Sequence, residues 1–120
     1  MKIFVSHSTR FDFNNDLYNP IRESKLVEKH AFFFPHETDT VSNTKNTIQE
    51  TCDIVLAEVS HPSTGQGIEL GWAEDVKKKI ICIYKEGKEY SSSLKAIANT
   101  FIEYKNNVDL IKKLETIFKT

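Results

Sequence analysis

Short, nearly continuous apolar runs separated by helical stretches constrain the fold of this chain more than any other feature. Three such runs lie at residues 3–5, 53–59 and 79–84, and runs at 31–34 and 100–104 complete the series. Runs rich in β-branched residues and bounded by polar residues are typical of parallel strands covered on both faces. Helical patterns fill the gaps, so the expected order is β-α-β-α-β-α-β-α-β.

This alternation predicts an α/β fold, a flavodoxin-like or Rossmann-like three-layer sandwich with a five-stranded parallel sheet and helices on both faces. With 120 residues, the chain has the size of one domain, and we expect residues 1–120 to form it. Helices are expected at residues 44–51, 66–78 and 92–98, in a first segment marked by Leu17, Ile21 and Leu26 and interrupted at Asn19-Pro20, and in a C-terminal stripe of Val108, Ile111, Leu114 and Phe118 capped by Asn106 or Asn107.

Charge, cysteine content and hydropathy exclude several classes of protein. Sixteen basic residues against 17 acidic ones give a net charge of −1, which argues against a nucleic-acid polymer or a membrane surface as partner. No apolar run is long enough to span a bilayer, and the N-terminus turns polar too early for a signal peptide. Cys52 and Cys82 are too few for a disulfide scaffold, so a cytoplasmic location is expected. The four histidines show no spacing that predicts a metal site.

Polar and small residues follow the expected strands, at the edge where ligands bind in open parallel sheets. The segment from Pro62 to Gly71 holds three of the four glycines. Gly65 and Gly67 predict a tight turn into a helix, and this places Glu69 in the first helical turn, where the macrodipole favours an ionised carboxylate. Such a carboxylate suits a glycosyl nucleophile. An ordinary loop and helix start is the alternative interpretation.

The longest motif resembles a known family. Residues 54–71 read IVLAEVSHPSTGQGIELG, similar to the signature A-E-V-x-x-P-S-x-G-x-G-x-E-L-G of 2'-deoxynucleoside 5'-phosphate N-hydrolases, a branch of the nucleoside 2-deoxyribosyltransferase superfamily. Residues 4–18 also align with that branch without a gap. The resemblance implies cleavage of the N-glycosidic bond of a nucleoside or its monophosphate through a glycosyl-enzyme intermediate on Glu69, by transfer or by hydrolysis, without a cofactor.

The same resemblance implies the remaining site residues. Ser93 or its neighbour Ser92 would reach a phosphate from an adjacent subunit, so a homodimer or larger homo-oligomer is expected. The other implied substrate-binding residues are Ser6, His7 and Ser8 after the first strand and Ser63, Gly65 and Gly67 in the central motif.

One departure from the family pattern leaves the proton donor open. Lys45 stands where the branch carries an aspartate, and a lysine could contact a phosphate or an acidic base substituent instead. The leaving base still needs a proton, for which His36 and Glu37 are the candidates, followed by His7. Lys45 also supports an alternative class, a non-catalytic nucleotide-binding or sensing module. A flavodoxin-like signalling domain is ranked last, because paired acids are missing after the first strand.

Overall fold

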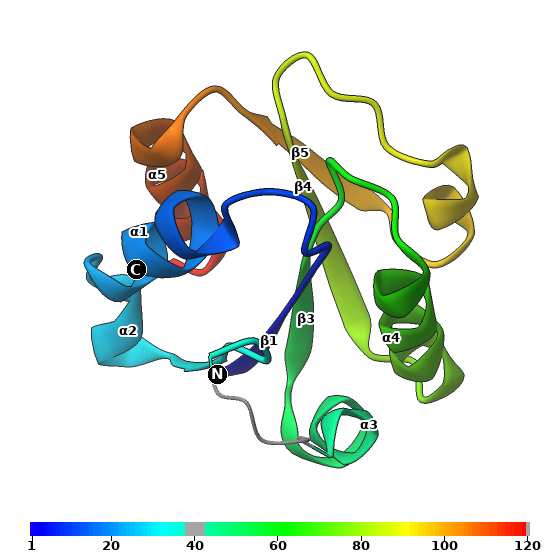
Figure 1. Cartoon of the computed structure of the whole chain (residues 1–120). Coiled ribbons are helices and arrows are strands. Elements are labelled where there is room, and N and C mark those ends of the chain that lie inside the picture. The colour runs from blue at the N-terminus through cyan, green and yellow to red at the C-terminus, as the bar shows by residue number, and fades with distance from the viewer. Residues whose placement is uncertain (38–42, 120) are drawn as a thin grey trace.

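The structure, a computed structural model, describes residues 1–37 and 43–119. Its centre is a five-stranded, all-parallel sheet in the order β2-β1-β3-β4-β5 (Figure 1). The predicted fold class is confirmed, because each expected apolar run forms a strand of this sheet. The strands are β1 (Lys2–His7), β2 (Ala31–Phe33), β3 (Ile54–Glu58), β4 (Lys79–Lys85) and β5 (Thr100–Tyr104).

Helices cover both faces of the sheet. In Figure 1, α1, α2 and α5 lie on one side and α3 and α4 on the other. The helical segments are η1 (Asn14–Tyr18), α1 (Asn19–Arg22), α2 (Leu26–Lys29), α3 (Thr44–Asn46), η2 (Thr47–Thr51), α4 (Thr64–Asp75), η3 (Ser92–Ala96) and α5 (Asn107–Ile117).

Alternation along the strands divides the core into two clusters, because successive strand residues point to opposite faces. The first cluster, under α1 and α5, includes Ile3, Val5, Ile54, Leu56, Ile81, Ile83, Leu110 and Leu114. The second, under η2 and α4, includes Phe4, Val55, Ala57, Ile80, Cys82, Ile48 and Leu70. Both cysteines are free and buried, and Asp53 binds the Lys2 backbone N–H at 2.7 Å at the edge opposite the site. The face to which a residue of β1 or β3 points therefore determines which helices its side chain contacts.

Two helical predictions need correction. The first helical segment consists of η1, which passes directly into α1 at Asn19, and of α2 after a turn, and Pro20 lies where η1 passes into α1. In α5, Val108 does not join the buried stripe, since 81% of its surface is exposed. The buried face is formed by Leu110, Leu114 and Phe118, which recur every four residues, and Val108 lies about 200° from Leu110 around the helix.

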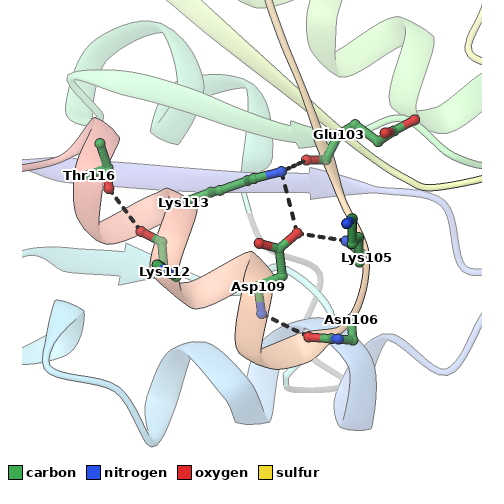
Figure 2. A network of polar contacts seen from close by, with 7 residues as sticks. All are labelled: Glu103, Lys105, Asn106, Asp109, Lys112, Lys113 and Thr116. Carbon is green, nitrogen blue, oxygen red and sulfur yellow. Dashed lines mark hydrogen bonds and ion pairs between the residues drawn. The ribbon is translucent and has the colours of Figure 1, made fainter.

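The start of α5 is fixed to the end of β5 by a polar network (Figure 2). Asn106 is the N-cap, and its side chain accepts a hydrogen bond from the Asp109 N–H at 2.8 Å. The Asp109 carboxylate accepts from the Lys105 N–H at 2.8 Å and pairs with Lys113 at 3.3 Å. These contacts, the Lys105 N–H first, lower the pKa of Asp109. Lys113 also donates to the Glu103 carbonyl, so the turn after β5 is held from both sides.

Candidate functional site

The site lies where β1 and β3 end side by side. Their last paired residues are Ser6 with Ala57 and His7 with Glu58. β1 is flanked by β2 on one side and β3 on the other, so successive crossovers leave this point toward opposite faces of the sheet. In the order 2-1-3-4-5, this reversal opens a crevice beyond the carboxyl ends of the two strands, the usual place for a ligand.

Glu69, on α4, lies beside the end of β1. The hydroxyl of Ser6 donates a hydrogen bond to its Oε1 at 2.8 Å. Ser6 is buried and Glu69 is half-buried. The second carboxylate oxygen, Oε2, makes no hydrogen bond with any residue in the two described ranges. One oxygen is therefore held in place and the other remains available to a ligand.

Burial raises the pKa of Glu69 to about 7, and the Ser6 hydrogen bond opposes this rise. The expected position of Glu69 in the first helical turn is wrong. α4 begins at Thr64, so Glu69 is its sixth residue and lies in the second turn. The field of the helix N-terminus fades within the first turn, and the loss of hydration outweighs it.

The glycines also differ from expectation. Gly65 and Gly67 lie inside α4 rather than in a turn, and α4 is capped by Ser63, whose Oγ accepts from the Gln66 N–H at 3.3 Å. A Cβ atom at either glycine would meet no atom within 4 Å. Gly65 precedes Glu69 by four residues, so the two share one edge of the helix, whereas Gly67 lies on the other. Gly65 therefore leaves open the space one turn above the carboxylate.

A pocket of about 320 Å³ lies along the edge of α4 that carries Gly67. Its lining includes Ser63 and Ser93 of the same chain, whereas the resemblance implies that Ser93 acts from a neighbouring subunit, and Glu69 is not among its lining residues. The other lining residues are Val59, Pro62, Gln66, Gly67, Leu70, Ser91, Leu94 and Ile97. None of these carries a charge, so an anion here would depend on hydroxyls, backbone N–H groups and the start of α4.

His7 makes no hydrogen bond with Glu69. β1 extends two residues beyond the predicted run, and alternation turns His7 toward the face opposite Ser6. Its Nδ1 lies 2.8 Å from the Ser8 carbonyl, which can only accept, so Nδ1 carries the proton. Nε2 lies 2.5 Å from the Tyr18 hydroxyl and accepts a hydrogen bond from it. The Tyr18 oxygen in turn accepts from the backbone N–H of His36 at 3.2 Å. Burial lowers the pKa of His7 to about 4, so the ring stays neutral.

The two proton-donor candidates lie beyond the carboxyl end of β2. His36 is exposed, and its ring centroid is 5.1 Å from that of His7. Glu37 is exposed and forms an ion pair with Arg22. Neither makes a hydrogen bond with Glu69, and both stay predictions.

The predicted site residues Ser8 and Lys45 lie in different parts of the structure. Ser8 is buried, and its Oγ accepts from the Arg10 N–H at 3.1 Å, which fixes the turn after β1. Lys45 is exposed on α3 and has no ion pair with another described residue.

Two residues that the sequence analysis did not single out are buried at the same strand ends. Glu58 accepts hydrogen bonds from the Tyr104 hydroxyl and from the N–H and Oγ of Ser60, the latter two at 2.6 and 3.0 Å. The Gln66 amide binds the carbonyls of Ser6 and Glu58. Both are polar residues inside an apolar pattern: Glu58 lies in a strand, and Gln66 lies one turn before Leu70. This break in the apolar pattern is the sequence feature that could have identified them.

Replacing Tyr104 with phenylalanine is expected to lower the free energy of unfolding by about 1–3 kcal/mol, because the buried Glu58 carboxylate loses a donor. Chemical denaturation measures this loss. Tyr90→Phe is the matched control, since the Tyr90 ring stacks on Phe101 at 4.5 Å and its hydroxyl has no hydrogen bond to a described residue. Equal stability of the Tyr104 variant and the wild type would contradict the assigned network.

Within residues 1–37 and 43–119, no group of three or more histidine, cysteine, aspartate or glutamate side chains is placed to hold a metal ion. No helix in these ranges has the length and apolar content needed to cross a membrane.

Comparisons with known proteins identify relatives of one chemical class. No family model matches the chain. A 5-hydroxymethyl-dUMP N-hydrolase of Tetraodon nigroviridis is 43% identical over 49 residues, covering 39% of this chain and 34% of that protein. A Nematostella vectensis protein, provisionally named 2'-deoxynucleoside 5'-phosphate N-hydrolase 1, is 45% identical over 80 residues, covering 65% of this chain and 50% of that one. The matches thus span at most half the length of these relatives.

A solved structure matches over a greater length. The CMP N-glycosidase of Clostridium botulinum superposes with a TM-score of 0.68 at 26% identity, covering 96% of this chain and 99% of that one. Together with the named N-hydrolases, it confirms the resemblance to the nucleoside 2-deoxyribosyltransferase superfamily and its N-hydrolase branch.

Proposed function

We propose that this chain is a single catalytic domain that cleaves the N-glycosidic bond of a nucleoside 5'-monophosphate, with Glu69 as nucleophile. The observation that carries the proposal is the Glu69 carboxylate, held by the Ser6 hydroxyl at 2.8 Å beside the crevice between β1 and β3. Its relatives are named as enzymes that act on nucleoside monophosphates, including a 5-hydroxymethyl-dUMP N-hydrolase and a CMP N-glycosidase.

In the proposed reaction, Oε2 of Glu69 attacks the anomeric carbon of the sugar. The C–N bond breaks, and its electron pair leaves with the base, which takes up a proton from His36, Glu37 or water. Positive charge on the sugar ring is stabilised by the adjacent carboxylate before the ester forms. Water then hydrolyses the ester and restores Glu69. A transferase would instead pass the sugar to a second base.

The position of α4 supports a phosphate near its N-terminus. The first backbone N–H groups of a helix have no partner within it, and the helix dipole favours an anion there. Gly65 lies about 6 Å along the axis from Glu69, at 1.5 Å per residue, a separation that a pentose phosphate can bridge. Ser63 caps this end of α4, and Ser6 lies beside Glu69. We propose that these residues surround the sugar phosphate, with Lys45 available to the phosphate or base.

The role of Ser93 tests the proposed homo-oligomer. Ser93 lines a pocket with Ser63 within one subunit, away from Glu69. We propose that its contact with the phosphate bound beside Glu69 comes from the neighbouring subunit, in a dimer or larger assembly. Sedimentation at micromolar concentration measures this state, and mixing a Ser93→Ala subunit with a Glu69→Gln subunit should restore part of the activity if the serine acts across subunits. A monomer with full activity would contradict this arrangement.

The activity is tested by chromatography of purified protein with deoxyribonucleoside and ribonucleoside monophosphates and the free nucleosides. We expect release of free base and sugar phosphate, with monophosphates preferred over nucleosides. Adding a second base distinguishes hydrolysis from transfer, because a transferase forms a new nucleoside. Calorimetric binding of a monophosphate without its consumption would instead support the non-catalytic module suggested by Lys45.

Replacing Gly65 with alanine is expected to stabilise the protein while lowering its activity. The residue is helical, and no atom lies within 4 Å of the added Cβ, so the helix gains up to about 1 kcal/mol. The methyl group occupies the approach to Glu69, so we expect kcat/KM to fall roughly tenfold, a loss of about 1.4 kcal/mol in transition-state binding. Thermal unfolding and steady-state kinetics measure the two effects.

Gly67→Ala is the matched control for the Gly65 variant. It has the same helical setting and the same open space around the added Cβ, but it lies on the edge of α4 away from Glu69. We expect a similar gain in stability and a smaller loss of activity. Unchanged activity in the Gly65 variant would place the sugar elsewhere.

A further inference from the structure

The Gln66 side chain connects α4 to both strands that form the crevice. Its Nε2 donates to the Ser6 carbonyl at 3.2 Å and to the Glu58 carbonyl at 2.8 Å, and only 5% of the residue is exposed. A primary amide has two N–H groups, so both are used by these two carbonyls. The amide nitrogen therefore has no proton left for a ligand.

These two carbonyls belong to neighbouring strands at the point where the strands separate. Ser6 pairs in register with Ala57, and Glu58 pairs with His7, the last pair of the β1–β3 ladder. The Gln66 amide thus bridges β1 and β3 at the floor of the crevice and fixes α4 over it. No other side chain in the described ranges donates to these two carbonyls.

Gln66 and Glu69 are three residues apart on α4 and lie next to each other on its surface. Ser6 is therefore bound by α4 twice, with its carbonyl accepting from Gln66 at 3.2 Å and its hydroxyl donating to Glu69 at 2.8 Å. A shift of the helix relative to β1 would change both contacts together.

We propose that Gln66 is a positioning residue for Glu69: its amide fixes α4 and Ser6 relative to each other, so that the Ser6 hydroxyl aims the carboxylate into the crevice. This inference rests on the proposed function of Glu69 and adds a residue that does not touch the substrate. A merely structural role for Gln66 would affect the stability of the fold and leave the state of Glu69 unchanged.

The test uses Gln66→Met, which keeps an unbranched side chain of similar length and removes both donors. We expect kcat to fall roughly 100-fold, as for a displacement of about 1 Å in a reacting group, with less than about a threefold change in KM. Carbon-13 NMR of the Glu69 carboxyl supplies a readout that does not depend on activity. The pKa of Glu69 is expected to rise above its wild-type value of about 7, because the Ser6 hydrogen bond that lowers it is weakened.

Gln49→Met is the matched control. The Gln49 amide also holds α4, by donating to the Trp72 carbonyl at 3.0 Å, but it contacts the part of the helix that follows Glu69. We expect a comparable loss of stability with kcat and the pKa of Glu69 unchanged.

Gln66→Glu keeps the shape of the side chain and serves as the second variant if Gln66→Met does not fold. It should likewise lower kcat, since it removes the amide donors, and kcat is the readout for this variant because its added negative charge raises the pKa of Glu69 by itself. Wild-type kcat and an unchanged Glu69 pKa in a folded Gln66 variant would overturn the proposal, as would failure of both variants to fold. An inactive wild type would instead overturn the proposed function, while the NMR titration would still test the positioning of Glu69.

Discussion

Replacing Glu69 with glutamine is expected to reduce turnover of a nucleoside monophosphate roughly 10⁴-fold or more, because an amide cannot form the glycosyl ester. The substitution keeps the size of the side chain and an oxygen that can accept the Ser6 hydrogen bond at 2.8 Å in the wild type. Single-turnover chromatography of released base measures the loss. The variant should still bind the monophosphate in calorimetry, with a Kd within a few-fold of the wild type.

The stability of the same variant provides its internal control. In the wild type, burial raises the pKa of Glu69 to about 7 from its ordinary value of 4.5, so the native state binds a proton more readily than the unfolded chain. The wild type therefore loses stability as the pH rises from about 4.5 to about 7. Glu69→Gln has no such loss, so it should be more stable than the wild type at pH 8 by on the order of 1–3 kcal/mol.

This difference should disappear below about pH 4.5, where Glu69 is protonated in both states. Denaturant unfolding at pH 4 and pH 8 measures it. An inactive variant that is less stable at both pH values would point to a damaged fold rather than a lost nucleophile. A variant with wild-type turnover would remove Glu69 from the reaction.

The strands could be predicted because their signal is local. A buried parallel strand needs a short run of β-branched residues, and each such run forms a strand of the observed sheet. The face of a residue at the end of a run is harder to predict, because it depends on how far the strand continues. β1 continues to His7, and one added residue is enough to turn a side chain to the opposite face.

The motif predicted a carboxylate near the start of a helix, but neither its place in the second turn of α4 nor its protonation was predictable. The sequence places a carboxylate after a glycine-containing segment, and the helix dipole was the only local effect that could be assessed. Whether hydration is lost depends on β1 and on the Ser6 hydroxyl, which lies 63 residues away in the sequence. Gln66 was missed for a related reason, since its two acceptors belong to β1 and β3 and no local pattern connects them.

The raised pKa of Glu69 also predicts the pH dependence of the reaction. A nucleophile must be ionised, so kcat/KM should rise with pH and level off above about 7. Below that value it should fall about tenfold per pH unit, which amounts to roughly 100-fold at pH 5. Steady-state kinetics between pH 5 and pH 9 measures this rising limb of the pH profile. The profile of kcat/KM reports the group of the free enzyme that must lose its proton.

Two variants identify the group responsible for this limb. Ser6→Ala removes the hydrogen bond that lowers the pKa of Glu69, so the limb should move to higher pH. His36→Gln should leave it in place, and His7, with its pKa lowered to about 4, cannot produce it. If kcat/KM instead falls as the pH rises through 7 in both the wild type and His36→Gln, then Glu69 acts while protonated. It would then donate a proton to the leaving base, and the attack on the sugar would belong to water.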